Sequence, residues 1–179
     1  VIARDYANNM GALGTGSIGG VSGAVGIASN TTTINRDTVA EVTGRNRTAN
    51  DIKARDFTVE AVAHHGIASI DVAGSIAAVG VANANDVALL SGRTRAGISN
   101  VNASLSRNFN LEANRKANLH LITGTAGIGA VGAGVSVNVV QDDSETEAAA
   151  KTSRIAFTAN DVSHASVKAV NRSDSEWRT

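Results

Sequence analysis

The stretch Phe57-Thr58-Val59-Glu60-Ala61 returns as Phe109-Asn110-Leu111-Glu112-Ala113, 52 residues later (109 − 57). In both copies apolar residues alternate with polar ones, which is the period-two pattern of a β-strand with one buried face. A weaker third copy follows as Val167-Lys168-Ala169. A strand that recurs at a long fixed interval indicates a repeat architecture in which successive copies stack on one another.

Other markers keep step with this strand. An Arg-Asp-aromatic element occurs as Ala3-Arg4-Asp5-Tyr6, Ala54-Arg55-Asp56-Phe57 and Ser106-Arg107-Asn108-Phe109, at spacings of 51 (57 − 6) and 52 residues. A glycine-rich element occurs as Gly23-Ala24-Val25-Gly26, Ala77-Ala78-Val79-Gly80 and Gly129-Ala130-Val131-Gly132, at spacings of 54 (77 − 23) and 52 (129 − 77). A longer match joins residues 48–52 to residues 158–162. We expect about three and a half units of roughly 52 residues, each making two turns of a coil, with Arg4, Arg55 and Arg107 in line along one edge.

The local pattern predicts how each unit is built. From Val131 to Val139 the odd positions hold Val or Ala and the even positions hold Gly, Ser or Asn, which predicts a strand whose valines are buried. Polar clusters at residues 29–32, 83–86, 99–102 and 141–144 have turn chemistry and predict corners. For residues 145–151 one helical turn is an alternative to a strand.

Frequent strands at a fixed period, without helical crossovers, point to an all-β parallel β-solenoid built from repeats of about 52 residues. The composition agrees, because 18 Gly, no Pro and only 3% aromatic residues suit a narrow interior. We expect Ala, Val, Ile and Gly where opposed sheets approach closely, and Phe where the coil is wider. Residues 1–179 would form a single β-solenoid segment, a fragment of a longer repeat protein.

The charge balance argues against several classes of partner. The chain has 16 Lys+Arg and 16 Asp+Glu, and therefore no surplus of cations for a nucleic acid. It has no Cys, which excludes disulfides and thiolate metal sites. No run of 18 uncharged apolar residues occurs, so we expect no membrane insertion.

The run Gly-Ala-Val-Gly-Ala-Gly-Val-Ser-Val-Asn at residues 129–138, with sister runs at residues 23–30 and 77–85, resembles the passenger repeats of large secreted bacterial surface proteins. These are the filamentous-haemagglutinin-like adhesins of two-partner secretion, autotransporter passengers and leukotoxin-type exoproteins. The resemblance implies a right-handed parallel β-helix, located extracellularly or on the bacterial cell surface. It also implies a non-enzymatic shaft for adhesion, whose partner is a receptor or glycan on a host or neighbouring cell.

Two groups of residues suggest specific chemistry. Gly14-Thr15-Gly16-Ser17-Ile18-Gly19 matches the dinucleotide-binding pattern Gly-x-Gly-x-x-Gly, but no helical segment follows and the pattern recurs at residues 127–132, which favours a close-packed backbone and no cofactor. The acidic cluster Asp142, Asp143, Glu145 and Glu147 predicts a solvated corner. Its alternatives are a calcium site or, with Arg154, the groove of a polysaccharide lyase or hydrolase.

The histidines and the recurring arginines favour structural roles. His64 and His65 are adjacent, so on a strand they would point to opposite faces, and we expect no metal site. The recurring arginines would pair with neighbouring carboxylates rather than offer a ladder of cations to a glycan. We assign no catalytic, cofactor-binding or metal-binding residue. A third hypothesis is a self-assembling extracellular fibre subunit, because a solenoid without caps leaves strand edges free for end-to-end association.

Overall fold

The computed structural model describes residues 1–44, 51–158 and 164–178. Its strands form two sheets in which every pairing is parallel. Sheet A contains β1 (Ile2–Ile18), β4 (Asp51–Ile76), β6 (Asn102–Ile128), β8 (Arg154–Phe157) and β9 (His164–Arg178). Sheet B contains β2 (Gly23–Asn35), β3 (Thr38–Thr43), β5 (Val79–Ser99) and β7 (Val131–Lys151). The described part of the chain contains no helix long and apolar enough to cross a membrane.

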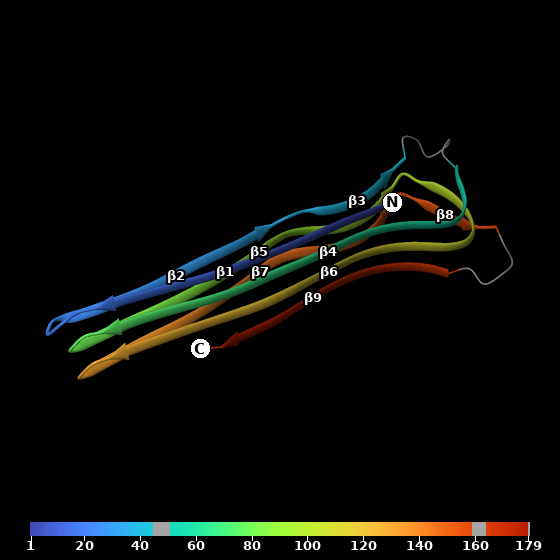
Figure 1. Ribbon diagram of the computed structural model, residues 1–179. Coiled ribbons are helices and arrows are strands. Elements are labelled where there is room, and N and C mark those ends of the chain that lie inside the picture. Colours follow the sequence, from blue (N-terminus) through green and yellow to red (C-terminus); the bar gives the residue numbers. More distant parts are fainter. Residues whose placement is uncertain (45–50, 159–163, 179) are drawn as a thin grey trace.

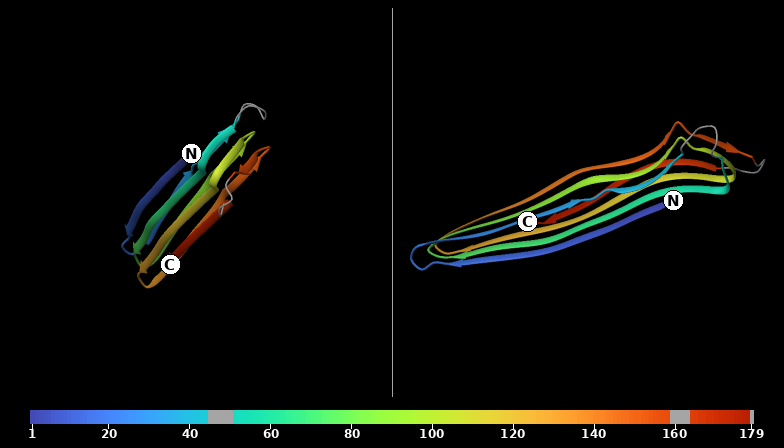
Figure 2. Two further views of the ribbon diagram at one scale, coloured as in Figure 1. Left: turned by 90° about the vertical axis from the view of Figure 1, so that its right-hand side faces the viewer. Right: turned by 90° about the horizontal axis from the view of Figure 1, so that it is seen from above.

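The chain passes from one sheet to the other and back, so each passage stacks on the preceding one. Long strands of sheet A alternate along the sequence with long strands of sheet B, and they lie side by side in both views (Figure 1, Figure 2). The turns that join β1 to β2, β4 to β5 and β6 to β7 gather at the left end of Figure 1. The fold is therefore all-β, with long parallel strands in two sheets, consistent with β-solenoid stacking.

One repeat corresponds to one turn of this coil, and the expectation of two turns was wrong. Phe57 pairs with Phe109 at a distance of 52 residues, and the rings of the two residues are 5.9 Å apart. Leu111 pairs with Val167, which confirms the weaker third copy. The strands are longer than the period-two windows suggested, β6 alone having 27 residues. Two such strands and two short turns use up a whole repeat.

The first unit is out of step with the others. Tyr6 pairs with His64, not with Phe57, and Arg4 pairs with Val62, seven positions (62 − 55) beyond Arg55. Only Arg55 and Arg107 lie near one another, at a register shift next to Ala54, so the expected line of three arginines is wrong. The reason is a longer corner. Seven residues separate Thr43 from Asp51, whereas two separate the equivalent Ser99 and Asn102. The long-range match of residues 48–52 to 158–162 falls largely outside the described residues.

Most of the polar clusters predicted as corners lie inside strands. Residues 29–32, 83–86 and 141–144 belong to β2, β5 and β7, and residues 145–151 continue β7 without a helical turn. Only residues 99–102 form a corner, where Asn100 has a φ of 53°. Inside a stacked coil, Asn and Asp occupy equivalent positions of successive turns, as in the row Asn30, Asp86 and Asn138. Such rows satisfy residues that would otherwise favour turns.

The size of the core side chains decreases along the strands. Near the N-terminus of β4 and β6 the core contains Val59, Leu105, Phe109 and Leu111, whereas near the turns its cluster consists of Ala28, Ala73, Ala82 and Ala84. We call the region near the turns, residues 14–29, 72–85 and 124–137, the narrow half. The rest of the described chain is the wide half. A Cβ on Gly26 would lie 2.2 Å from the Gly74 carbonyl oxygen, so the two sheets are in backbone contact there. The expectation of small residues at the close approach is confirmed.

In the narrow half, the alternation has the opposite sense to the one predicted. Val131, Val135, Val137 and Val139 face outward and are exposed, while Ser136 and Asn138 of the same strand face inward. A Cβ on the intervening Gly134 would lie 2.4 Å from Thr125 Oγ1 of the opposite sheet. There is no room for a Val side chain between the sheets. Steric exclusion, and not hydrophobicity, decides which face of β7 is inside.

This burial pattern predicts opposite consequences for two adjacent residues of β6. Leu121 is 0% exposed and Ile122 is 41% exposed. Leu121→Ala should lower the free energy of unfolding by about 2–5 kcal/mol, because it leaves a cavity in the core. Ile122→Ala, the matched control, should cost less than about 1 kcal/mol, because its side chain is already half in water. Urea denaturation followed by circular dichroism measures both. Equal losses would contradict the assigned register.

Candidate functional site

The acidic cluster of β7 is divided between the two faces of its strand. The side chain of Asp142 faces inward and accepts a hydrogen bond from Arg115 Nη1 at 2.9 Å. Glu145 and Glu147 pair across the outer face with Arg93 (3.2 Å) and Arg95 (3.3 Å). The prediction of a solvated corner was wrong, because the segment lies within a strand whose neighbour β5 supplies the arginines. These carboxylates do not converge on one groove, which is what calcium binding or paired acid-base catalysis would require.

Arg154, the cation assigned to the catalytic alternative, lies away from these carboxylates. It begins β8 in sheet A and lines an open hollow of about 350 Å³ together with Asn102, Thr152 and Ser153. No residue of the acidic cluster lines that hollow.

Arg115 is a buried cation that the sequence analysis missed. It is 1% exposed, and its Nη1 donates to Asp142 and to Asn171 Oδ1 (3.0 Å). Its Nε and Nη2 are also buried and have no hydrogen-bond partner among the described residues. Asp142 is the only carboxylate with which Arg115 forms an ion pair in the described part of the chain. The only sequence signal was the position itself, since Arg115 continues the inward parity of Leu111 and Ala113.

The widest charged surface lies on the outer face of sheet B in the wide half. Arg95 Nε lies 3.2 Å from Glu41 and 3.3 Å from Glu147, so one cation is held between carboxylates of the preceding and the following turn. Gly97, two residues further along β5, has no side chain to fill the space beside them. The result is a groove of about 230 Å³, whose lining includes Glu41, Arg95, Gly97, Ser99 and Lys151. This groove presents both charges and hydroxyl groups to a ligand, and we take it as the candidate binding surface.

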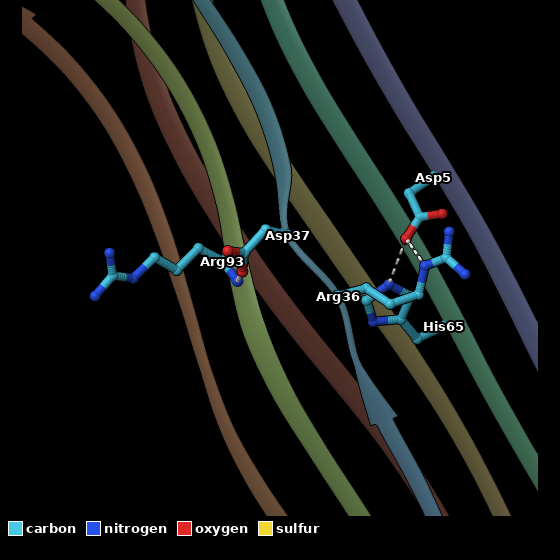
Figure 3. Close-up of polar contacts among 5 residues, drawn as sticks. All are labelled: Asp5, Arg36, Asp37, His65 and Arg93. Carbon is cyan, nitrogen blue, oxygen red and sulfur yellow. Dashed lines mark hydrogen bonds and ion pairs between the residues drawn. The ribbon is translucent and has the colours of Figure 1, made fainter.

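A second polar group joins the first two turns where β2 ends (Figure 3). The Asp5 carboxylate accepts a hydrogen bond from Arg36 Nε at 2.8 Å and lies 3.3 Å from His65 Nε2. Asp37 accepts a hydrogen bond from the backbone N–H of Arg93 at 2.7 Å. Burial lowers the pKa of His65, although its hydrogen bond to Asp5 opposes this effect, so the ring favours the neutral form at pH 7. These bonds fix the break between β2 and β3.

The backbone at this break depends on a glycine. Gly92 has a φ of 118°, and a Cβ there would lie 2.1 Å from the Arg36 carbonyl oxygen. Side chains other than glycine rarely adopt this conformation, and here one would also collide with the neighbouring turn.

The adjacent histidines do point to opposite faces, as predicted. His65 is buried beside Asp5, while His64 is exposed and makes an edge contact with Tyr6 at 5.3 Å between ring centroids. His120 lies on another turn, 3.4 Å from Glu176. Among residues 1–44, 51–158 and 164–178, no three His, Asp or Glu side chains are placed to hold a metal ion together.

Both Gly-x-Gly-x-x-Gly segments lie at the turns of the narrow half and are followed by strands. Gly19 follows β1, and a Cβ there would lie 2.9 Å from the Gly23 carbonyl oxygen. On Gly129, between β6 and β7, the added Cβ would be 1.7 Å from the Ala77 carbonyl oxygen of the preceding turn. These glycines therefore permit close stacking of the turns, and no helix N-terminus is present to receive a phosphate.

Two aspartates inside the coil were also missed. Asp71 of β4 and Asp86 of β5 are 0% exposed, and burial raises the pKa of each. The charge of Asp86 raises the pKa of Asp71 further. Asp86 accepts a long hydrogen bond from Asn30 Nδ2 (3.5 Å), whereas both carboxylate oxygens of Asp71 lack a partner among the described residues. Parity with Ile67 and Ala73 was the signal that could have found Asp71.

Comparisons with known proteins found no similarity for this chain: no family model, no curated protein and no solved structure matches it.

The buried ion pair predicts a large difference between neighbouring aspartates. Asp142→Ala should lower the free energy of unfolding by about 3–5 kcal/mol, because it leaves the Arg115 guanidinium buried without a counter-charge. Asp143→Ala, on the exposed face of the same strand, should change the stability by no more than about 0.5 kcal/mol. Chemical denaturation measures both variants. If Asp142→Ala were as mild as its neighbour, Arg115 would not depend on this carboxylate.

The raised pKa of Asp71 predicts a pH-dependent stability. A carboxyl group whose pKa is raised by folding favours the folded state fully below its unfolded pKa of 3.8, and this contribution is lost as pH rises through the folded pKa. Asp71→Asn removes the charge, so at about pH 7 the variant should be more stable than the wild type by about 1–3 kcal/mol. The gain should vanish at about pH 3. Thermal denaturation across this range, with Asp143→Asn as control, measures it, and a gain independent of pH would contradict the assignment.

Proposed function

We propose that this chain is a non-enzymatic shaft segment of a secreted bacterial surface protein, working in adhesion. The observation that carries the proposal is the unbroken stacking of successive turns, in which every strand of one turn pairs in parallel with a strand of the next. Such an array transmits force through backbone hydrogen bonds along its axis and presents the outer sheet faces for contact. The resemblance of residues 129–138 to passenger repeats supports a right-handed coil and an extracellular or cell-surface location.

The partner we propose is a receptor or glycan on a host or neighbouring cell. The groove around Gly97 supports this choice, because its Arg95, Lys151, Glu41 and Ser99 side chains can exchange hydrogen bonds with hydroxyl and carboxylate groups. It is formed by side chains of three successive turns, on β3, β5 and β7. A polar ligand would therefore read the stacked turns and not one loop.

A second candidate function is a self-assembling fibre subunit. Val167 of β9 is 56% exposed, although its partner Leu111 in β6 is fully buried by the opposite sheet. Another strand added beside β7 would cover β9 in the same way. End-to-end association would supply such a strand from a second copy, and its signature would be growth that depends on protein concentration.

An attachment assay tests the adhesive function. The chain is immobilised, and cells that attach under flow are counted against a passivated surface. We expect attachment, and we expect Gly97→Arg to reduce it severalfold because the new side chain occupies the groove. Thr31→Arg, which is also exposed on sheet B but outside the groove, is the matched control. Attachment no greater than on the passivated surface would contradict the proposal.

A further inference from the structure

The narrow half has its apolar side chains outside and its polar side chains inside. Between the sheets, sheet A supplies only Thr15, Ser17, Ala73, Ser75, Thr125 and Gly127, and the inward residues of sheet B are Ala, Gly and Ser. Residues 14–29, 72–85 and 124–137 contain no Asp, Glu, Lys, Arg or His. A sheet face in water normally shows the reverse arrangement, with polar residues outside.

The outer face of sheet A carries a continuous apolar row. Ile18, Ile76 and Ile128 stack on successive turns, and Ile18 is 86% exposed. Val72 lies four residues before Ile76 on the same face and is half exposed. Between these rows lie Gly16, Gly74 and Ala126, which add no polar group.

The outer face of sheet B matches it on the opposite side of the coil. Val79 stacks on Val131, and Val25 stacks on Val81. Val135 and Val137 continue the apolar surface along β7, and all six of these side chains are at least 40% exposed where Val25, Val79, Val81, Val131, Val135 and Val137 are compared. The turn between the two faces holds Val21, which is 100% exposed. The apolar surface therefore wraps around both faces and the turn.

The wide half of the same strands shows the ordinary arrangement. Its outward positions carry ion pairs between turns, among them Arg93 with Glu145 and Lys116 with Asp174. Near the boundary on sheet A, Tyr6 is exposed and contacts His64. Aromatic side chains with a polar tip favour the interface between an apolar phase and water. The coil is thus amphipathic across its width, and every turn repeats the pattern.

We propose that the narrow half is a lipid-contacting edge: its two outer faces and its turns lie in the acyl region of a lipid layer, while the charged wide half stays in water. A second copy of the chain could cover one flat face but would leave the other face and Val21 in water. A lipid layer covers all three at once. An uncharged surface also offers a charged partner no complementary group.

The dimensions and the backbone fit this environment. From Val131 to Val137 the strand advances about 20 Å at 3.3 Å per residue, which exceeds the roughly 15 Å of hydrocarbon in one leaflet. Backbone groups of β4, β5 and β6 in the narrow half pair with strands on both sides, so the inner turns bring few unsatisfied amides into lipid. The proposal departs from the expectation of no membrane insertion, which rested on the lack of a continuous apolar run. Alternation along strands hides such a surface from that criterion.

Vesicle flotation with pure phosphatidylcholine tests the proposal. The chain should float with the vesicles, and binding should persist at about 1 M NaCl, since no charge is involved. Two double variants remove one face each: Val72→Lys with Ile76→Lys on sheet A, and Val79→Lys with Val137→Lys on sheet B. Each should lower the partition coefficient about tenfold or more, because a lysine is poorly accommodated in hydrocarbon. The control, Ile2→Lys with Val39→Lys, changes exposed apolar residues on the two outer faces of the wide half and should bind as the wild type does.

A fluorescence measurement keeps the proposal falsifiable if a variant folds poorly. Because the chain contains no cysteine, Val21→Cys and Val39→Cys can each be labelled with one environment-sensitive dye. Vesicles should shift the emission of the label at residue 21 to shorter wavelength and leave the label at residue 39 unchanged. No flotation, or a shift at residue 21 that needs only a higher protein concentration, would overturn the proposal. The second result would assign the surface to contact between copies.

Discussion

The close approach of the two sheets at Gly26 and Gly74 is the constraint on which the rest of the structure depends. A single Cβ would not fit there, and Gly134 faces Thr125 under the same restriction. Because the interior of the narrow half admits little more than a methyl or hydroxyl group, its larger apolar residues must lie outside. The strands diverge toward the wide half, where Leu and Phe fill the core and charged residues occupy the surface. One geometrical taper thus produces two surfaces of opposite character.

The polar residues inside the coil show how little the stacking tolerates variation. Arg115 is buried and held by Asp142 from the opposite sheet, and Asp71 lies near Asp86 across the interior. Buried charges of this kind cost stability unless they are paired or neutralised, so they oppose the apolar packing around them. They also specify register, since a shift of one residue along a strand would move each of them to the outer face.

The two proposed surfaces use different parts of the same turn. The groove at Gly97 lies among ion pairs and suits a polar ligand, whereas the narrow half has no charged side chain and suits a lipid layer. Neither is a deep pocket. In a stacked coil both surfaces lengthen with each added turn, so that weak contacts of one turn are multiplied along the axis. The proposed lipid contact does not depend on the proposed adhesive role, because no residue of the groove lies in the narrow half.

The sequence by itself determined that the chain is an all-β repeat protein with strands stacked at 52 residues, since Phe57 and Phe109 or Gly80 and Gly132 mark equivalent positions directly. Period-two alternation also identified the strands and the opposite directions of His64 and His65. Tertiary structure decided which alternating face is inside. Hydrophobicity predicted buried valines in β7, but the distance between sheets, set by glycines on the opposite strand, excluded them. The same long-range packing brought Arg115 to Asp142, a contact between residues 27 positions apart that alternation within one strand cannot reveal.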